Sequence, residues 1–230
     1  MVSQDGGKSF HKVGEIKTTL TYRAWGAHIF TDGETLYLVW TGMSREARTQ
    51  KELQGRFKAV FFSFSSDRGR NWSKPVIVND RKSGGHNPKG FVDSKGIIYV
   101  CWKGKENMLY LSLSRNGGKT WEGPWDIRRG DYPGFTESEG TVFLTYAGKE
   151  GRIIFITYTR DSGKTWETVT PGEFPLIIEN PLTWKKEGKF YVVFRALSPA
   201  FILFGEERKN IYYILSPDGE KWKGPVKLSP

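Results

Sequence analysis

The chain has 230 residues, 37% hydrophobic and 15% aromatic, enough to bury the core of one all-β domain. No uninterrupted apolar run approaches the roughly 18 residues that a membrane-spanning helix needs, so no membrane span is expected. The formal net charge of +10 favours anionic partners, but the basic residues are scattered without the aromatic and basic platform that binds single strands, so nucleic acid is not an expected partner.

Residues 1–10 contain neither a basic region nor an apolar stretch, so we expect no secretory signal within the chain. An extracellular or cell-surface location stays open if an upstream segment is missing. Cys101 is the single cysteine, so we expect a small buried hydrophobic group rather than a disulfide. His11, His28 and His86 lack the spacing of zinc ligands, and phosphate-loop and dinucleotide motifs are absent, so we expect neither a metal site nor a cofactor.

Taken in chain order, the sequence predicts short strands rich in β-branched and aromatic residues, arranged as repeating units. The predicted strands are 27–33, 35–40, 57–64, 74–78, 87–93, 97–102, 108–114, 141–146, 152–159, 189–194, 210–216 and 224–228. Glycine-containing turns join the first and second strands of each unit. The polar stretch 44–54 predicts a long loop with one or two helical turns.

One phrase recurs after the third strand of each unit. Its copies are SQDGGKSF (3–10), SSDRGRNW (65–72), SRNGGKTW (114–121), TRDSGKTW (159–166) and SPDGEKW (216–222). We expect the Asp or Asn to accept hydrogen bonds from backbone amides two residues on, the glycine to supply a positive φ, and the aromatic residue to pack beneath the hairpin. A calcium or phosphate loop is not favoured, because four copies hold one acidic group at most and the last holds two, fewer than a calcium loop needs.

This repeat predicts an all-β fold, a β-propeller of four-stranded antiparallel blades in which the phrase forms the turn between the third and fourth strands. The chain then holds about four and a half blades: four complete units, preceded by a leading copy and its fourth strand. We take 1–230 as a single domain. Three ways of closing the ring stay open: the N-terminal strand, self-association with a second chain, or a missing upstream segment.

The repeated phrase resembles the Asp-box, or BNR repeat, of the sialidase (neuraminidase) superfamily, whose members fold as β-propellers. The resemblance covers essentially the whole chain. It implies that the boxes are structural and lie away from the active face.

Alignment of the units on Gly33, Gly96, Gly140 and Gly188 places four segments at the start of the first strand, at the end opposite the boxes: RAWG (23–26), GHNP (85–88), GDYP (130–133) and IENP (178–181). These starts surround the channel of a propeller, so we predict a ligand-binding ring there. Its members are Arg23, Trp25, His86, Asn87, Asp131, Tyr132, Glu179 and Asn180. The alternative is that the prolines and their polar neighbours only shape the crossover between blades.

A second alignment, on the residues that end the second strands, places Thr41, Lys103, Ala147 and Arg195 at equivalent positions. Arg195 is therefore expected beside Glu179. The alternative reading is an ordinary ion pair that braces two strands.

The resemblance to sialidases implies roles for three of these residues. Glu179 and Arg195 are similar to a Glu and Arg of the family, and Arg23, which follows Tyr22, is similar to its first arginine. In the family the Glu polarises a tyrosine nucleophile, three arginines bind the carboxylate of the sugar, and a loop Asp is the acid/base. The catalytic candidates are thus Glu179, Arg23 and Arg195, with Trp25, His86, Asn87, Asp131, Tyr132 and Asn180 binding substrate.

The sequence departs from the family pattern in three places. The loop 41–55 carries Glu46 and Glu52 but no Asp, and the third arginine and the tyrosine have no counterpart after the last copy. We therefore predict a sialidase-like propeller that interacts with an acidic glycan or other anionic small ligand, with exo-sialidase-like hydrolysis left open. The alternatives are a non-catalytic propeller that binds through the ring and the loops 41–56 and 195–210, and an assembly module with 200–204 as an apolar contact.

Overall fold

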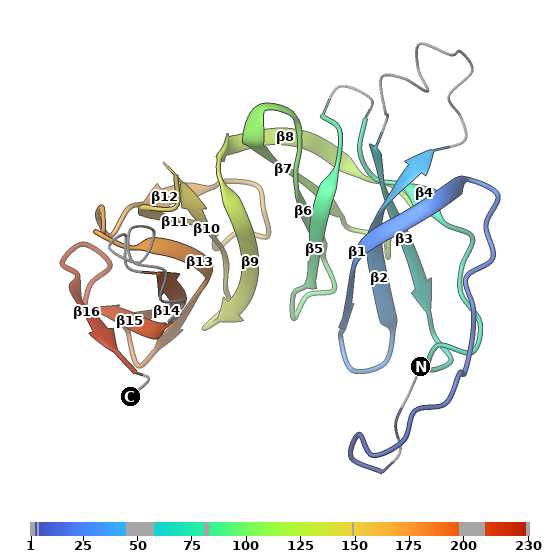
Figure 1. The fold of residues 1–230 in the computed structure, drawn as a ribbon, viewed down its shortest axis with the longest axis horizontal. Helices are drawn as coiled ribbons and strands as arrows, with labels where there is room; N and C mark the ends of the chain where they lie inside the picture. The colour runs from blue at the N-terminus through green and yellow to red at the C-terminus, as the bar shows by residue number, and fades with distance from the viewer. Residues whose placement is uncertain are drawn as a thin grey trace. The chain divides into compact units, whose positions relative to one another are not determined.

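The computed structural model describes residues 3, 5–44, 58–80, 83–148, 150–197 and 210–228 (Figure 1). The chain divides into two compact units. Unit 1 comprises Met1–Lys105 and Tyr110–Trp125, and unit 2 comprises Glu106–Leu109 and Asp126–Pro230. The predicted loop at 44–54 and the apolar segment 200–204 fall almost entirely outside the described residues.

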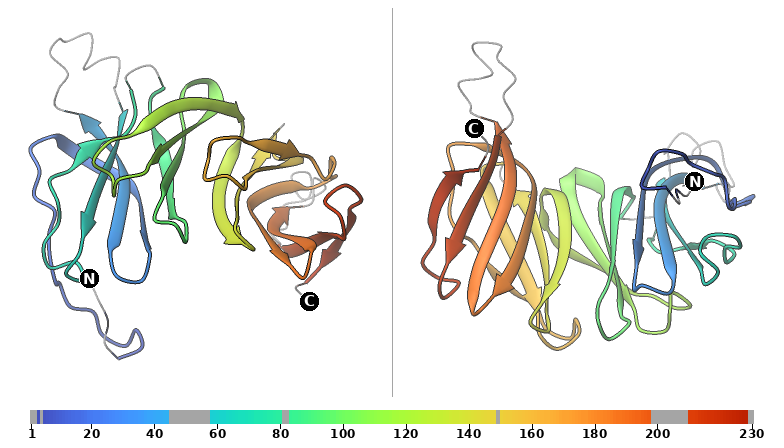
Figure 2. Two further views of the ribbon diagram at one scale, coloured as in Figure 1. Left: turned by 180° about the vertical axis from the view of Figure 1, so that it is seen from behind. Right: turned by 90° about the horizontal axis from the view of Figure 1, so that it is seen from below.

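The described residues form four sheets of four antiparallel strands, each a meander in chain order (Figures 1 and 2). Sheet 1 holds β1 (Thr21–Thr31), β2 (Leu36–Ser44), β3 (Lys58–Ser65) and β4 (Val76–Ile77); sheet 2 holds β5 (His86–Val92), β6 (Ile98–Lys103), β7 (Met108–Ser114) and β8 (Glu122–Arg129). Sheet 3 holds β9 (Asp131–Ser138), β10 (Thr141–Gly148), β11 (Ile153–Thr159) and β12 (Glu167–Val169); sheet 4 holds β13 (Ile177–Lys186), β14 (Lys189–Leu197), β15 (Asn210–Ser216) and β16 (Lys223–Lys227). A short 3₁₀ turn, η1 (Lys105–Asn107), joins β6 to β7.

These sheets confirm the prediction of four-stranded antiparallel units, and each predicted strand overlaps an observed one. In sheets 2 and 3 the second strands, β6 and β10, are covered on both faces and are nearly continuous apolar runs in the sequence. No helix in the described part of the chain is long and apolar enough to span a membrane.

Each unit has its own apolar core between its two sheets. In unit 1, Val39 and Phe62 of sheet 1 belong to one buried cluster with Ile98 and Trp102 of sheet 2. Cys101 is also fully buried, which confirms its expected packing, and burial raises the pKa of its thiol.

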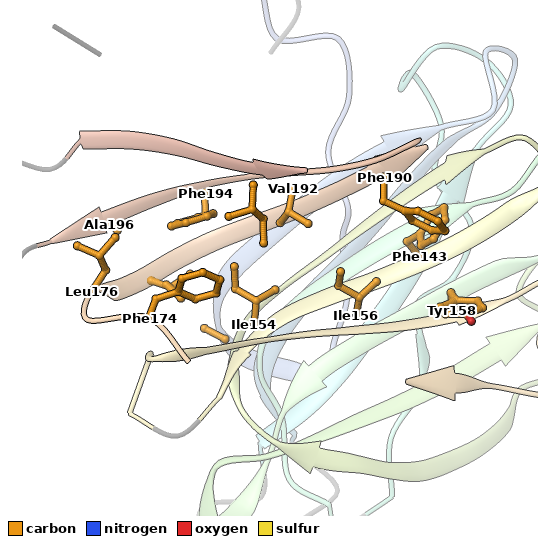
Figure 3. Close-up of a cluster of buried hydrophobic side chains, with 13 residues drawn as sticks. Phe143, Ile154, Ile156, Tyr158, Phe174, Leu176, Phe190, Val192, Phe194 and Ala196 are labelled. Carbon is orange, nitrogen blue, oxygen red and sulfur yellow. The ribbon is translucent and has the colours of Figure 1, made fainter. Parts of the chain in front are cut away.

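In unit 2, alternate residues of β14 face the core (Figure 3). Phe190, Val192 and Phe194 pack against Phe143 and the side chains of β11, so the intervening residues of β14 lie on the opposite face of sheet 4. That opposite face carries part of the candidate site.

The repeated phrase forms the turn between the third and fourth strands, as predicted, and glycines at its centre have positive φ, 84° at Gly69 and 81° at Gly163. Trp72 donates its indole N–H to the carbonyl of Gly69 within the same turn, at 3.1 Å. Phe10, which replaces the tryptophan in the first copy, is instead 57% exposed.

The expected hydrogen-bond spacing of the turn is wrong in most copies. Asp67 Oδ1 accepts from the amide of Asn71 at 2.8 Å, and Asp161 Oδ1 accepts from the amide of Thr165 at 2.9 Å, both four residues on. Asp218 instead accepts from the amides of Glu220 and Lys221, two and three residues on. Two consecutive residues of positive φ tighten the loop and bring the later amides to the carboxylate. The bonds from Asn71 lower the pKa of Asp67 to about 2.

The leading segment differs from the prediction of a fourth strand after the first copy. Between the first copy and Thr21, the described residues form no ladder beyond a single bridge at position 11. Ile16 and Leu20 instead pack against the buried Trp40 and Phe61 of sheet 1. This segment therefore covers the face of sheet 1 that is turned away from sheet 2.

Candidate functional site

In the first strand of every sheet, one cross-strand residue pair is directly followed by a β-bulge. The pairs are Trp25 with Thr41, His86 with Lys103, Asp131 with Ala147, and Glu179 with Arg195. The predicted position of Arg195 beside Glu179 is therefore confirmed. Each pair lies at the end of its sheet opposite the repeated turn, and bulges commonly re-aim side chains at such edges.

The residue after each pair has a left-handed backbone. The φ angles are 60° at Gly26, 45° at Asn87, 54° at Tyr132 and 49° at Asn180. Asparagine and glycine tolerate this conformation, which accounts for Asn87 and Asn180 without any ligand. Tyrosine does not, so Tyr132 is held in a strained conformation that a smaller residue would adopt more easily.

In unit 2, Glu179 and Arg195 form an ion pair, with Glu179 Oε2 2.5 Å from Arg195 Nη2. The glutamate side chain is 12% exposed and that of the arginine 45%. Because Ile178 and Ala196 face the core of unit 2, this pair lies on the opposite face of sheet 4.

Tyr132 lies in the electrostatic field of the same pair. Burial, followed by the charges of Glu179 and Asp131, raises the pKa of Tyr132, and Arg195 opposes the shift. Its amide donates to the Asp131 carboxylate at 2.9 Å. The phenol therefore stays protonated at neutral pH and can donate a hydrogen bond to a ligand. Unit 2 thus brings together Asp131, Tyr132, Glu179, Asn180 and Arg195 at one end of its two sheets.

In unit 1, His86 lies between two lysines. The Lys58 ammonium contacts His86 Nε2, and Lys103 is the cross-strand partner of His86. Burial, then the charges of Lys58 and Lys103, lower the pKa of His86. Lys58 also lies 6.0 Å from the centre of the Trp25 ring. Trp25, His86 and Asn87 are therefore close neighbours, since a side chain on Gly26 would meet Asn87 Oδ1 at 2.9 Å.

Arg23 is exposed and lines a pocket of about 480 Å³ in unit 1. The pocket lies between β1, β2 and the leading segment, and its lining residues are Ile16, Thr18, Thr21, Arg23, Ala24, Trp25, Gly26, Ala27, Leu38 and Trp40. The predicted ring would join residues of both units, and it stays a prediction.

Sequence reasoning missed Lys58. It is the first residue of β3, and only the starts of first strands and the ends of second strands were aligned. The start of the third strand lies at the same end of a meander, so a third alignment would have found it. Among the described residues, no group of three or more His, Cys, Asp or Glu is arranged to hold a metal ion.

No protein-family model and no curated protein matches the chain. Solved structures do match. A GH93 α-L-arabinofuranosidase of Fusarium graminearum is 18% identical with a TM-score of 0.66, over 96% of this chain and 71% of that one. The fold is a β-propeller.

Two further propellers are similar over most of this chain. A Hadza microbial sialidase is 16% identical with a TM-score of 0.60, and a Penicillium chrysogenum α-L-arabinanase is 20% identical with a TM-score of 0.57. The matches cover 90% and 86% of this chain but 47% and 64% of the sialidase and arabinanase chains. At these identities the likeness shows a propeller of four-stranded antiparallel blades and not an activity.

Proposed function

We propose that the chain is a sialidase-like β-propeller that binds an acidic glycan through the first-strand ends of its sheets. The observation that carries the proposal is the Glu179–Arg195 ion pair beside Tyr132, at the end of sheet 4 opposite its repeated turn. A carboxylate, a guanidinium and a phenol donor in one place match the hydroxyl and carboxylate groups of a sugar.

Three further features support the proposal. The repeated turns have the Ser/Thr, Asp/Asn and Gly pattern of the Asp-box, which accords with membership of the sialidase superfamily. A sialidase, an arabinofuranosidase and an arabinanase are among the solved structures similar to this chain. Strain at Tyr132 also fits a binding role, because strained residues cluster where a side chain must be held for a ligand.

Glycan binding and turnover can be tested together. Sialyllactose, lactose and arabinobiose are titrated into the full chain by calorimetry, and fluorogenic sialosides and arabinofuranosides are assayed for release. The Glu179→Gln variant should lose binding, whereas Glu220→Gln, in the repeated turn of the same sheet, should retain it. Equal binding by both variants would remove Glu179 from the site.

One observation favours a second candidate, self-association. The face of sheet 4 opposite the core of unit 2 exposes large apolar side chains: Leu182 at 42%, Trp184 at 36%, Ile211 at 46% and Val226 at 46%. A second copy of this chain would cover this face in an assembly module. Sedimentation at increasing concentration tests this, and a Val226→Glu variant should remain monomeric if the face is the contact.

A further inference from the structure

Three nitrogen-bearing side chains converge at one end of unit 1. Lys58 begins β3, His86 begins β5, and Lys103 ends β6. The Lys58 ammonium contacts His86 Nε2, and it lies over the ring of Trp25. Trp25 and His86 thus hold Lys58 from two sides, which reduces the entropy lost when it binds a ligand.

The backbone is built to bring β3 and β5 this close. The buried Asn79 amide donates to the carbonyl of Lys58 at 3.1 Å and to that of Gly84 at 2.7 Å, and its oxygen accepts from the amide of Val60 at 2.7 Å. Gly85 has no room for a side chain, since a Cβ would meet Val60 Cγ2 at 2.6 Å. The position of His86 against Lys58 is therefore fixed by buried contacts.

The cluster offers hydrogen-bond donors rather than acceptors. Because His86 Nε2 accepts from an ammonium, the imidazole is neutral and its proton is on Nδ1. The ring then carries one N–H donor, and the charges of both lysines act on it. The equivalent pair in sheet 4, Glu179 with Arg195, is neutral overall, whereas His86 with Lys103 is cationic.

We propose that Lys58, His86 and Lys103 form an oxyanion-binding subsite that takes the carboxylate or sulfate group of an acidic glycan. The glycan part rests on the proposed function. The inference that the subsite binds an oxyanion rests only on the hydrogen-bond donors of Lys58, His86 and Lys103, because an oxyanion accepts several charge-assisted hydrogen bonds at once.

The test is a titration of the full chain with sodium sulfate, glucuronate and glucose at constant ionic strength, followed by the NMR signals of the His86 imidazole. Sulfate and glucuronate should shift these signals saturably, and glucose should not. Lys58→Gln and Lys103→Gln should each bind roughly tenfold more weakly, the size of one lost charge-assisted hydrogen bond.

Lys95→Gln is the matched control, since Lys95 lies in the turn at the other end of sheet 2 and its loss changes the net charge equally. It should bind like the unaltered chain. No saturable shift, or equal affinity in all variants, overturns the subsite. If the chain binds sulfate but no glycan, the subsite is supported and the proposed function is wrong. If the chain binds neutral sugars in a way that depends on Glu179 but does not respond to sulfate, only the subsite is wrong.

Discussion

Glu179 and Arg195 face each other across β13 and β14, with their Oε2 and Nη2 atoms 2.5 Å apart. The next pairs on the same face are apolar: Leu182 lies opposite Val193, and Trp184 stacks on Tyr191 with ring centres 5.6 Å apart. The ion pair is therefore followed on this face of sheet 4 by two apolar pairs.

The pair should contribute little to stability. In a double-mutant cycle with Glu179→Gln and Arg195→Gln, we expect a coupling free energy of about 0.5–1 kcal/mol, because the arginine is partly exposed and solvent screens it. Urea unfolding of the four proteins measures this. A coupling of several kcal/mol would instead favour the strand-bracing role over ligand binding.

Tyr132→Asn should separate stability from binding. Asparagine occupies the equivalent left-handed positions 87 and 180, so this change relieves strain and should leave the free energy of unfolding unchanged or raise it by up to about 1 kcal/mol. Glycan affinity should fall because the phenol donor is lost. The reverse change, Asn180→Tyr, should lower stability; if Tyr132→Asn is the destabilising one, the phenol has a structural role.

The strands and the pairing of Glu179 with Arg195 could be predicted from the sequence, because alternation and repeated turns are local signals. Glu179 was matched to Arg195 by counting from a glycine and from an aromatic residue, and both counts held. The bulge after Glu179 could not be read this way, since Asn180 suits a loop as well as a left-handed strand position. A third alignment would place Lys58 at this end of sheet 1, but its contact with His86 could not be read from the sequence, because that contact depends on the packing of two sheets.

His28 should make unit 1 less stable in mild acid. Burial and the charge of Lys89 lower its pKa from 6.5 to about 4, and its Nδ1 accepts from the amide of Gly90 while its ring stacks on Phe30. The unfolded chain therefore binds a proton more readily, and stability present above pH 6.5 is lost as the pH falls towards 4. Unfolding at several pH values should show a shallower loss in His28→Gln; parallel curves would contradict the assignment.

Close packing beneath the repeated turn at 114–121 should make Gly118 intolerant of substitution. Its φ is 85°, and a Cβ would meet the ring of Phe62 at 2.1 Å, so Gly118→Ala should cost about 1–3 kcal/mol. Gly117→Ala is the control, because Gly117 also has a positive φ but nothing lies within 4 Å of its Cβ. Thermal unfolding should rank Gly118→Ala well below Gly117→Ala, and equal midpoints would show that the turn does not pack on Phe62.

The most direct test of glycan binding is calorimetric titration of the full chain and of Glu179→Gln with sialyllactose and lactose. We predict saturable binding of the acidic sugar by the unaltered chain, weaker binding of lactose, and loss of both in the variant. Absence of binding by the unaltered chain, or identical binding by the variant, would contradict the account.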